Sequence, residues 1–120
     1  MSSAVITMRR GGGDLSAVAE TLRHDLIANA NAELLCVKSH GTAGAQAILV
    51  SCEKFFFRNG SYASLNILLT DFDGVQTADI VGSGGGEGLF NVSWFANQDF
   101  AENAEKILKE YGFSTVEKKT

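Results

Sequence analysis

Apolar residues at helical spacing mark a first helix near the start of the chain. They advance by three, four and four positions and so lie on one helix face: Leu15, Val18, Leu22 and Leu26. Asp14 comes directly before them, where an N-cap belongs. We predict that this helix ends near residues 29–31, where two asparagines flank an alanine.

A second helical stripe lies near the other end of the chain: Phe100, Ala101, Ala104, Ile107, Leu108 and Tyr111. We predict Asn97 as its N-cap. Gly112 fits the position just after a helix end, where a left-handed residue is common. The following residues, 114–120, are predicted to form a flexible tail.

Segments of strand character surround the first helix and fill the space between the two helices. The predicted strands cover residues 4–8, 33–39, 45–58, 61–71, 75–81 and 89–95. Asn59-Gly60 and Asp73-Gly74 are predicted hairpin turns, because both central residues of a type I′ turn need positive φ. Residues 40–44 are predicted to form a loop.

The resulting order, β-α-β-β-β-β-β-α, predicts an α+β fold. We expect a mostly antiparallel sheet of five or six strands with two helices packed on one face, in a single domain over residues 1–113. The TATA-binding-protein-like fold and a short form of the helix-grip fold of lipid- and hormone-binding proteins share this outline. That analogy concerns the fold and carries no function.

Composition favours a globular protein that does not bind nucleic acid. Of the 120 residues, 45% are hydrophobic and 20% are charged, and the net charge of −4 disfavours contact with phosphates. No apolar stretch approaches the length of a membrane span or of a secretory signal, so we expect a cytoplasmic protein without a membrane partner. Cys36 and Cys52 are predicted to be reduced thiols in apolar strands.

A glycine-rich segment offers the most obvious candidate for ligand contact: Gly82, Ser83, Gly84, Gly85 and Gly86. Its spacing fits neither the dinucleotide-binding glycine pattern nor a phosphate-binding loop, and a strand-like segment follows it. We predict a flexible connection here, with a lid over a ligand site as the alternative.

No set of residues for catalysis or metal binding stands out. His24 is predicted on the exposed face of the first helix and His40 in a loop. Asp71, Asp73 and Asp79 surround a hairpin but lack the spacing of a calcium loop. We therefore predict no catalytic residue, no metal site and no cofactor.

Aromatic residues suggest an interaction surface. Three consecutive aromatics, residues 55–57, must place at least one ring on the sheet face opposite the helices. Exposed aromatic surface usually marks an interface. The candidate residues for a surface that binds a second copy or a ligand are Phe56, Tyr62, Leu68 and Trp94.

From about residue 45 to residue 111 the chain resembles a family of small uncharacterised bacterial proteins, a domain of unknown function. The residues that carry the resemblance are Glu53-Lys54-Phe55-Phe56-Phe57, Asn59-Gly60, Ser64-Leu65-Asn66, Ser83-Gly84-Gly85, Leu89-Phe90 and Phe100. Gly86 and Gly88 depart from the family pattern. The resemblance implies an intact domain and assigns no functional residue.

Two functions fit these observations best. The first hypothesis is a non-enzymatic interaction module, a homodimer that uses the second face of its sheet. The second is a carrier of a small apolar ligand, with a cavity between sheet and helices. An enzyme ranks third, since no acid, base or nucleophile set is recognisable.

Overall fold

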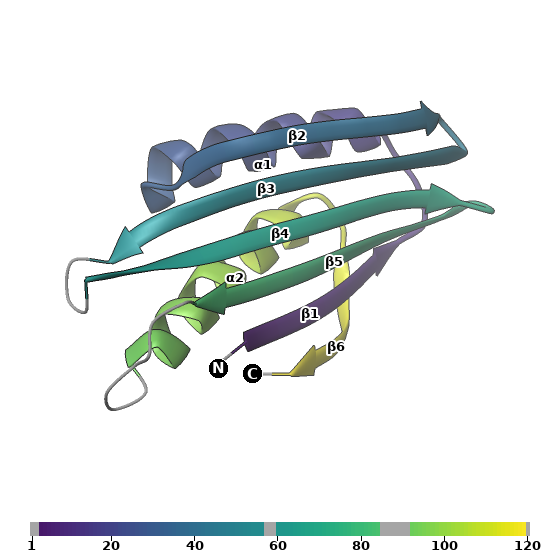
Figure 1. Cartoon of the computed structure of the whole chain (residues 1–120). Coiled ribbons are helices and arrows are strands. Elements are labelled where there is room, and N and C mark those ends of the chain that lie inside the picture. The colour runs from purple at the N-terminus through teal and green to yellow at the C-terminus, as the bar shows by residue number, and fades with distance from the viewer. Residues whose placement is uncertain (1–2, 57–59, 85–91, 120) are drawn as a thin grey trace.

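The computed structural model describes residues 3–56, 60–84 and 92–119, with the backbone alone for residues 29–30, 61 and 92–97. Eight elements follow one another (Figure 1): β1 (Ser3–Arg10), α1 (Leu15–Ala30), β2 (Glu33–Thr42), β3 (Ala45–Phe56), β4 (Ser61–Phe72), β5 (Val75–Gly84), α2 (Val92–Glu110) and β6 (Ser114–Lys119).

The strands form one open six-stranded sheet in the order β2-β3-β4-β5-β1-β6. Each neighbouring pair is antiparallel. Strands β2 to β5 follow one another as hairpins, whereas β1 lies between β5 and β6 (Figure 1). The predicted α+β class with an antiparallel sheet is confirmed.

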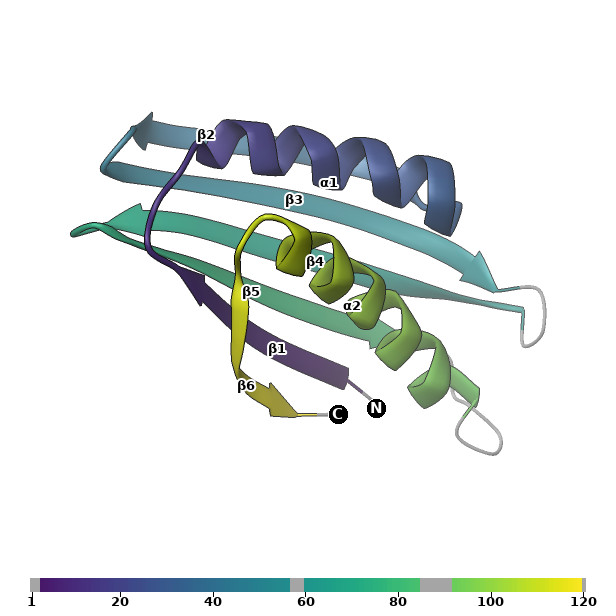
Figure 2. The same ribbon diagram turned by 180° about the vertical axis from the view of Figure 1, so that it is seen from behind.

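Both helices lie on the same face of the sheet, as predicted. In Figure 2 α1 runs in front of β2 and β3, and α2 in front of β4 and β5. The contacts agree, because α1 packs on β2, β3 and β4, and α2 packs on β4, β5 and β1. The opposite face of the sheet is not covered by either helix, and we call it the open face.

The core lies between the sheet and the two helices. Alternate strand residues point into it, including Ile6, Met8, Ile48, Val50, Leu65, Ile67, Leu69 and Ile80. The predicted helix stripes meet them, with Leu15, Val18, Leu22, Leu26, Phe100, Ala101, Ala104 and Leu108 all buried. Burying each large aliphatic side chain stabilises the fold by roughly 1.5–3 kcal/mol.

Local turn and cap residues behave as the sequence predicts. Asp14 caps α1, because its Oδ1 accepts the N–H of Ala17 at 3.2 Å. Asn31 ends the helix in the left-handed conformation at φ 55°. The hairpin between β4 and β5 turns at Asp73 and Gly74, both with positive φ (55° and 78°). Gly112 follows α2 at φ 89°, where glycine carries no steric penalty.

The start of α2 differs from the prediction. This helix already begins at Val92, so the strand predicted over residues 89–95 is wrong from Val92 onward, and Asn97 lies inside the helix instead of capping it. Residues 89–91 lie outside the described residues. The apolar and polar pattern of residues 92–95 fits a strand but also the first turn of a helix, because an amphipathic helical stripe follows in the sequence.

The tail predicted over residues 114–120 is also wrong for most of its length. Ser114–Lys119 form β6, which pairs with β1. The strand was missed because it carries a single large apolar residue, Val116, and is therefore almost free of hydrophobic alternation.

The loop predicted over residues 40–44 is shorter in the structure. Strand β2 continues to Thr42, so His40 lies in a strand. Gly41 accounts for the ambiguity. At its φ of 84°, a Cβ atom would come within 2.0 Å of the carbonyl oxygen of Ala45, so only glycine fits this strand position.

Candidate functional site

The open face alternates apolar and short polar side chains along the strands. Leu68 of β4 is 41% exposed and lies opposite Leu49 of β3. Val81 of β5 is 37% exposed, while Phe72 and Val75, which pair next to the β4–β5 hairpin, are 50% and 44% exposed. Apolar side chains of this size are therefore spread over the middle strands and one end of the face.

The polar side chains of the open face are hydrogen-bonded to one another across neighbouring strands. The hydroxyl group of Ser51 donates to Asn66 Oδ1 at 2.6 Å. Ser64 and Ser83 share a hydrogen bond of 2.8 Å between their hydroxyl oxygens. These contacts satisfy much of the polar surface between the apolar residues.

One charged group of the open face is held in the same way. Thr7 Oγ1 donates to Asp79 Oδ1 at 2.8 Å, across β1 and β5. In the sheet register, Leu68 lies between Leu49 of β3 and Asp79 of β5. Lys38 of β2 is the next residue in this row, on the other side of Leu49. The row through Leu68 therefore has a base towards one edge and an acid towards the other.

Two of the four residues predicted for this surface lie on it. Leu68 and Tyr62 both point to the open face, and Tyr62 is 53% exposed. Phe56 does not, because it packs against the buried core on the helix side. Its neighbour Phe55 takes the outward position, since successive strand residues alternate between faces. Trp94 lies in α2 instead of a strand, and its side chain is outside the described part.

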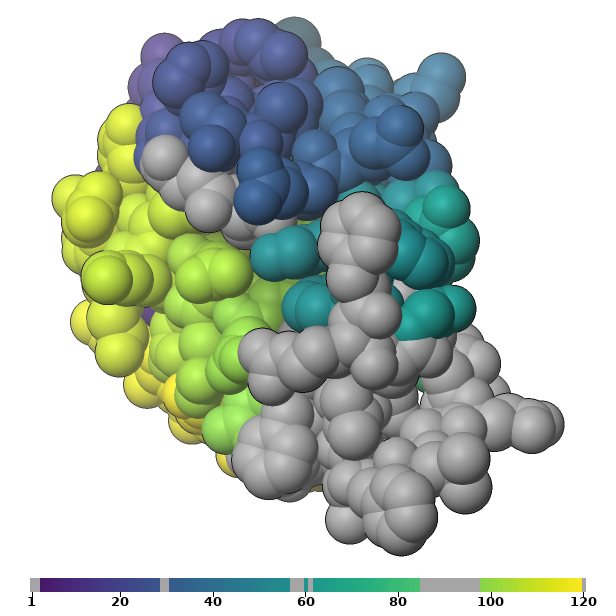
Figure 3. Space-filling view, turned by 90° about the vertical axis from the view of Figure 1, so that its left-hand side faces the viewer, coloured from purple at the N-terminus to yellow at the C-terminus, as the bar shows by residue number. Residues whose placement is uncertain are grey.

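A hollow of about 620 Å³ lies at the end of β3. Figure 3 looks onto this end of the molecule, where α1, the ends of β3 and β4, and α2 come together. Strand β3 continues for three residues beyond Glu53, which pairs with the first residue of β2, and the hollow lies beside this extension. It is lined by Asn31, Glu33, Glu53, Lys54, Phe55, Phe56 and Tyr62.

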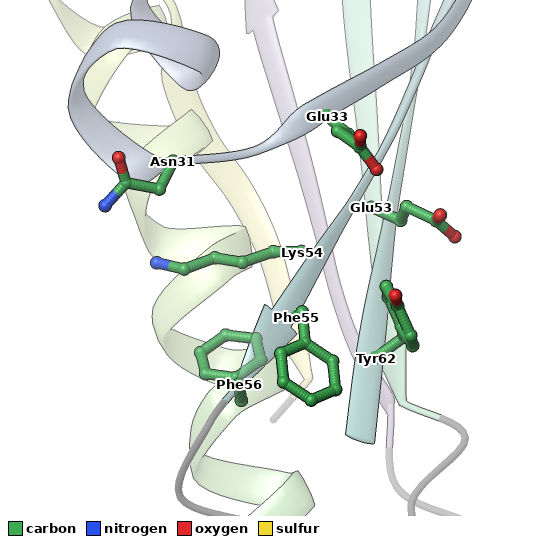
Figure 4. Close-up of a pocket in the computed structure, with 7 residues that line it drawn as sticks. All are labelled: Asn31, Glu33, Glu53, Lys54, Phe55, Phe56 and Tyr62. Atoms are coloured by element: carbon green, nitrogen blue, oxygen red, sulfur yellow. The ribbon is translucent and has the colours of Figure 1, made fainter. Parts of the chain in front are cut away.

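The side chains of this hollow separate onto two sides of β3 (Figure 4). Glu33, Glu53 and Tyr62 lie on one side, and Lys54 extends in the opposite direction, towards Asn31. The ammonium group of Lys54 is 5.0 Å from the centre of the Phe56 ring. The rings of Phe55 and Tyr62 are 5.0 Å apart and tilted by 59°.

A second hollow of about 500 Å³ continues from the Lys54 side to α2. Besides Lys54 and Phe56 it is lined by Asp99, Phe100, Glu102, Asn103 and Lys106. Both hollows lie at the end of the molecule, whereas the middle of the layer between sheet and helices is occupied by buried side chains. An apolar ligand in that layer would have to displace the core.

The glycine-rich segment does not form a loop over its whole length. Gly82, Ser83 and Gly84 belong to β5 and pair with β4. Gly85 and Gly86 lie outside the described residues. The lid proposed for this segment stays a prediction.

The two cysteines are free thiols. Cys52 is fully buried, and this burial, with a smaller contribution from Cys36, raises the pKa of its thiol to about 11. A thiol with this pKa is a poor nucleophile near neutral pH, since the thiolate is the reactive form.

The remaining candidates for chemistry are dispersed. Both histidines are exposed: His40 on β2, and His24 on α1 with its Nδ1 3.1 Å from Asp25 Oδ1. Asp71 accepts the N–H of Gly44 on the helix side, opposite to Asp79. Within the described residues, no three His, Cys, Asp or Glu side chains come together as a metal-binding group. None of the helices described is long and apolar enough to cross a membrane.

Comparison with known families gives a match that extends beyond the region of the resemblance. Residues 4–112 match a family described as a family of unknown function, DUF6054. The chain belongs to this family. The DUF6054 match covers all elements from β1 to α2 and ends before β6. No curated protein matches the sequence.

Proposed function

We propose that this DUF6054 protein is an interaction module that self-associates through the open face of its sheet. The observation that carries the proposal is the combination of half-exposed apolar residues, centred on Leu68, with polar neighbours that are hydrogen-bonded to one another. Exposed apolar side chains that are bordered by polar residues are found in many protein interfaces.

The internal hydrogen bonds lower the cost of covering this face. A buried polar group without a partner costs about 1–3 kcal/mol. Ser51 and Asn66, and Ser64 and Ser83, already bond to each other, so a second sheet could pack on them without leaving those donors unpaired. Apolar side chains such as Leu68 and Val81 would then supply the favourable free energy.

The size of the face suits a dimer. Six strands about 4.8 Å apart, with an average length of about ten residues at ~3.3 Å per residue, span roughly 29 by 32 Å, or about 930 Å². A standard protein interface buries about 800 Å² on each partner.

The charge pattern favours a second copy as the partner. A two-fold axis that runs along β4, in the plane between two facing sheets, places β2 of one copy over β1 of the other. Lys38 would then approach the Thr7–Asp79 pair of the second copy, twice by symmetry. A two-fold axis across the strands at the level of Leu68 would instead oppose Lys38 to Lys38.

The test is the mass in solution, measured by light scattering coupled to size exclusion over a range of protein concentrations. We expect a concentration-dependent dimer for the natural protein and a monomer for Leu68→Glu, because the carboxylate would be buried at the centre of the interface.

Ile27→Glu is the matched control. Ile27 is 40% exposed, like Leu68, but it lies on α1, away from the open face. This variant should dimerise normally. A natural protein that stays monomeric at all concentrations would contradict the proposal, as would equal dissociation of both variants. An excess mass that matches a bound lipid or a different protein would show that this molecule, and not a second copy, is the partner.

A further inference from the structure

We infer that the hollow at the end of β3 binds an organic cation, an ammonium or guanidinium group attached to a short apolar chain, on the side formed by Glu33, Glu53 and Tyr62. This site lies at the Tyr62 end of the same open face, because Glu53 is the cross-strand partner of Ser64, but binding of the cation does not require a second copy. Tyr62 lies six residues from Leu68 along β4, or roughly 20 Å in an extended strand.

The first argument is the charge of two neighbouring carboxylates. Glu33 and Glu53 are direct cross-strand partners on β2 and β3. Like charges in this position repel each other, because the Cβ atoms of directly opposite residues are only about 4.5–5.5 Å apart. A cation bound between the two carboxylates would convert this repulsion into attraction.

The charge is not compensated from within the described residues. The ion pairs found there involve other acidic groups: Glu20, Asp25, Glu102, Glu105 and Glu117. The nearest base in sequence, Lys54, extends to the other side of β3 and lies over Phe56 (Figure 4). Arg58 lies outside the described residues, and among the described residues no base serves this side, so a bound cation would supply the opposite charge.

The second argument is the aromatic wall of the same hollow. Tyr62 is 53% exposed although it lines a concave surface, and its ring packs at a tilt on Phe55. Cations are attracted to the faces of aromatic rings by about 0.5–2 kcal/mol, more as water is excluded. A methylene chain next to the charge would cover the aromatic surface.

The chemistry distinguishes an organic cation from a metal ion. A calcium ion takes 6–8 oxygen ligands, whereas this side of the hollow offers two carboxylates beside an apolar wall. The volume of about 620 Å³ also exceeds the space that one bare ion fills. The cation could be a free amine or guanidine, or a Lys or Arg side chain of a protein segment.

The experiment is a titration of isotope-labelled protein, followed by NMR, with three probes: tetramethylammonium, agmatine and the peptide acetyl-Gly-Arg-Gly-amide. We expect saturable shifts at Glu33, Glu53 and Tyr62. The double variant E33Q/E53Q should weaken binding by about tenfold or more, which corresponds to roughly 1.4 kcal/mol. Tighter binding of agmatine would indicate a free small cation, and tighter binding of the peptide would indicate a protein side chain.

Two further variants separate this site from general attraction to an acidic protein. Lys54→Met, on the opposite side of β3, should leave the affinity unchanged or slightly raise it, whereas Tyr62→Leu should reduce it. Both Gln substitutions replace surface carboxylates with isosteric amides, and the unshifted spectrum reports whether each variant is folded. Shifts that spread over the whole acidic surface, equal affinity of E33Q/E53Q, or no saturation with any probe would overturn the inference.

Discussion

At the scale of single residues, Arg10 connects three parts of the fold. Its Nε donates to Gln76 Oε1 at 2.6 Å, and its Nη1 donates to the carbonyl oxygen of Tyr111 at 2.8 Å, just after α2. Its guanidinium carbon lies 4.7 Å from the centre of the Phe113 ring. Gln76 in turn donates to the carbonyl oxygen of Gly13, before α1. One side chain thus positions the start of α1 and the end of α2 against the sheet.

Replacement of this guanidinium should therefore destabilise the protein. We expect Arg10→Lys to lower the free energy of unfolding by about 1–3 kcal/mol, because an ammonium group cannot reproduce the planar fork that serves Gln76 and Tyr111. Urea unfolding followed by circular dichroism measures the change. Arg23→Lys is the control, since among the described residues Arg23 pairs with Glu20 alone, on the exposed surface of α1. Equal effects of the two changes would contradict the role of Arg10.

At the scale of elements, polar contacts attach β6 to α2. The hydroxyl group of Thr115 donates to Glu105 Oε2 at 2.5 Å, and Lys118 Nζ lies 2.9 Å from Glu105 Oε1 and 2.8 Å from Glu102 Oε2. Burial of Glu105 opposes its ionisation, but the hydrogen bonds from Thr115 and Lys118 outweigh it and hold the pKa of this carboxyl below its ordinary value. The same contacts with Glu102 and Glu105 raise the pKa of Lys118.

These two shifts give the attachment of β6 a defined pH range. The contribution of Glu105 is present above its ordinary pKa of 4.5 and is lost as pH falls through the lowered value. The contribution of Lys118 is present below 10.5 and is lost as pH rises through the raised value. We expect the protection of the β6 amides from hydrogen exchange, measured relative to the unfolded chain at the same pH, to be greatest between these limits.

Glu105→Gln should remove the acid limb of this profile and lower the free energy of unfolding at neutral pH by about 1–2 kcal/mol. Glu117→Gln is the matched control, because the side chain of Glu117 is 62% exposed and, within the part of the chain that the structure describes, pairs with Lys119 alone. Protection of the β6 amides that does not fall at low pH, or that falls equally in both variants, would show that backbone pairing with β1 alone holds the strand.

At the scale of the whole molecule, the two-layer architecture leaves one sheet face uncovered by either helix. The proposed two-fold arrangement has a specific consequence for charge. Lys38→Glu should weaken the dimer by repulsion from Asp79 of the second copy, and Asp79→Lys should weaken it by repulsion from Lys38. The double variant should recover at least part of the lost affinity, measured as the dissociation constant by sedimentation. Additive losses would reject this arrangement while leaving self-association through Leu68 open to its own test.

Prediction from sequence worked best where one residue type has one structural role. The stripe from Leu15 to Leu26, the N-cap at Asp14 and the turn at Asp73-Gly74 follow from local sterics and hydrogen bonding, and all are confirmed. Prediction was weakest where distant contacts decide. β6 has no hydrophobic alternation and is held by β1 and by Glu105. The candidate surface was partly misassigned, because Phe56 and Phe55 differ only in which way the pleat turns them.

The sequence by itself therefore determined the α+β class, the antiparallel hairpins and the faces of both helices, because hydrophobic period and turn chemistry are local properties. Only the tertiary structure decided that β1 inserts between β5 and β6, that a polar segment becomes an edge strand, and that Glu33 and Glu53 meet beside Tyr62. These features join residues far apart in the chain. Their stability comes from pairing and packing that no short stretch of sequence specifies.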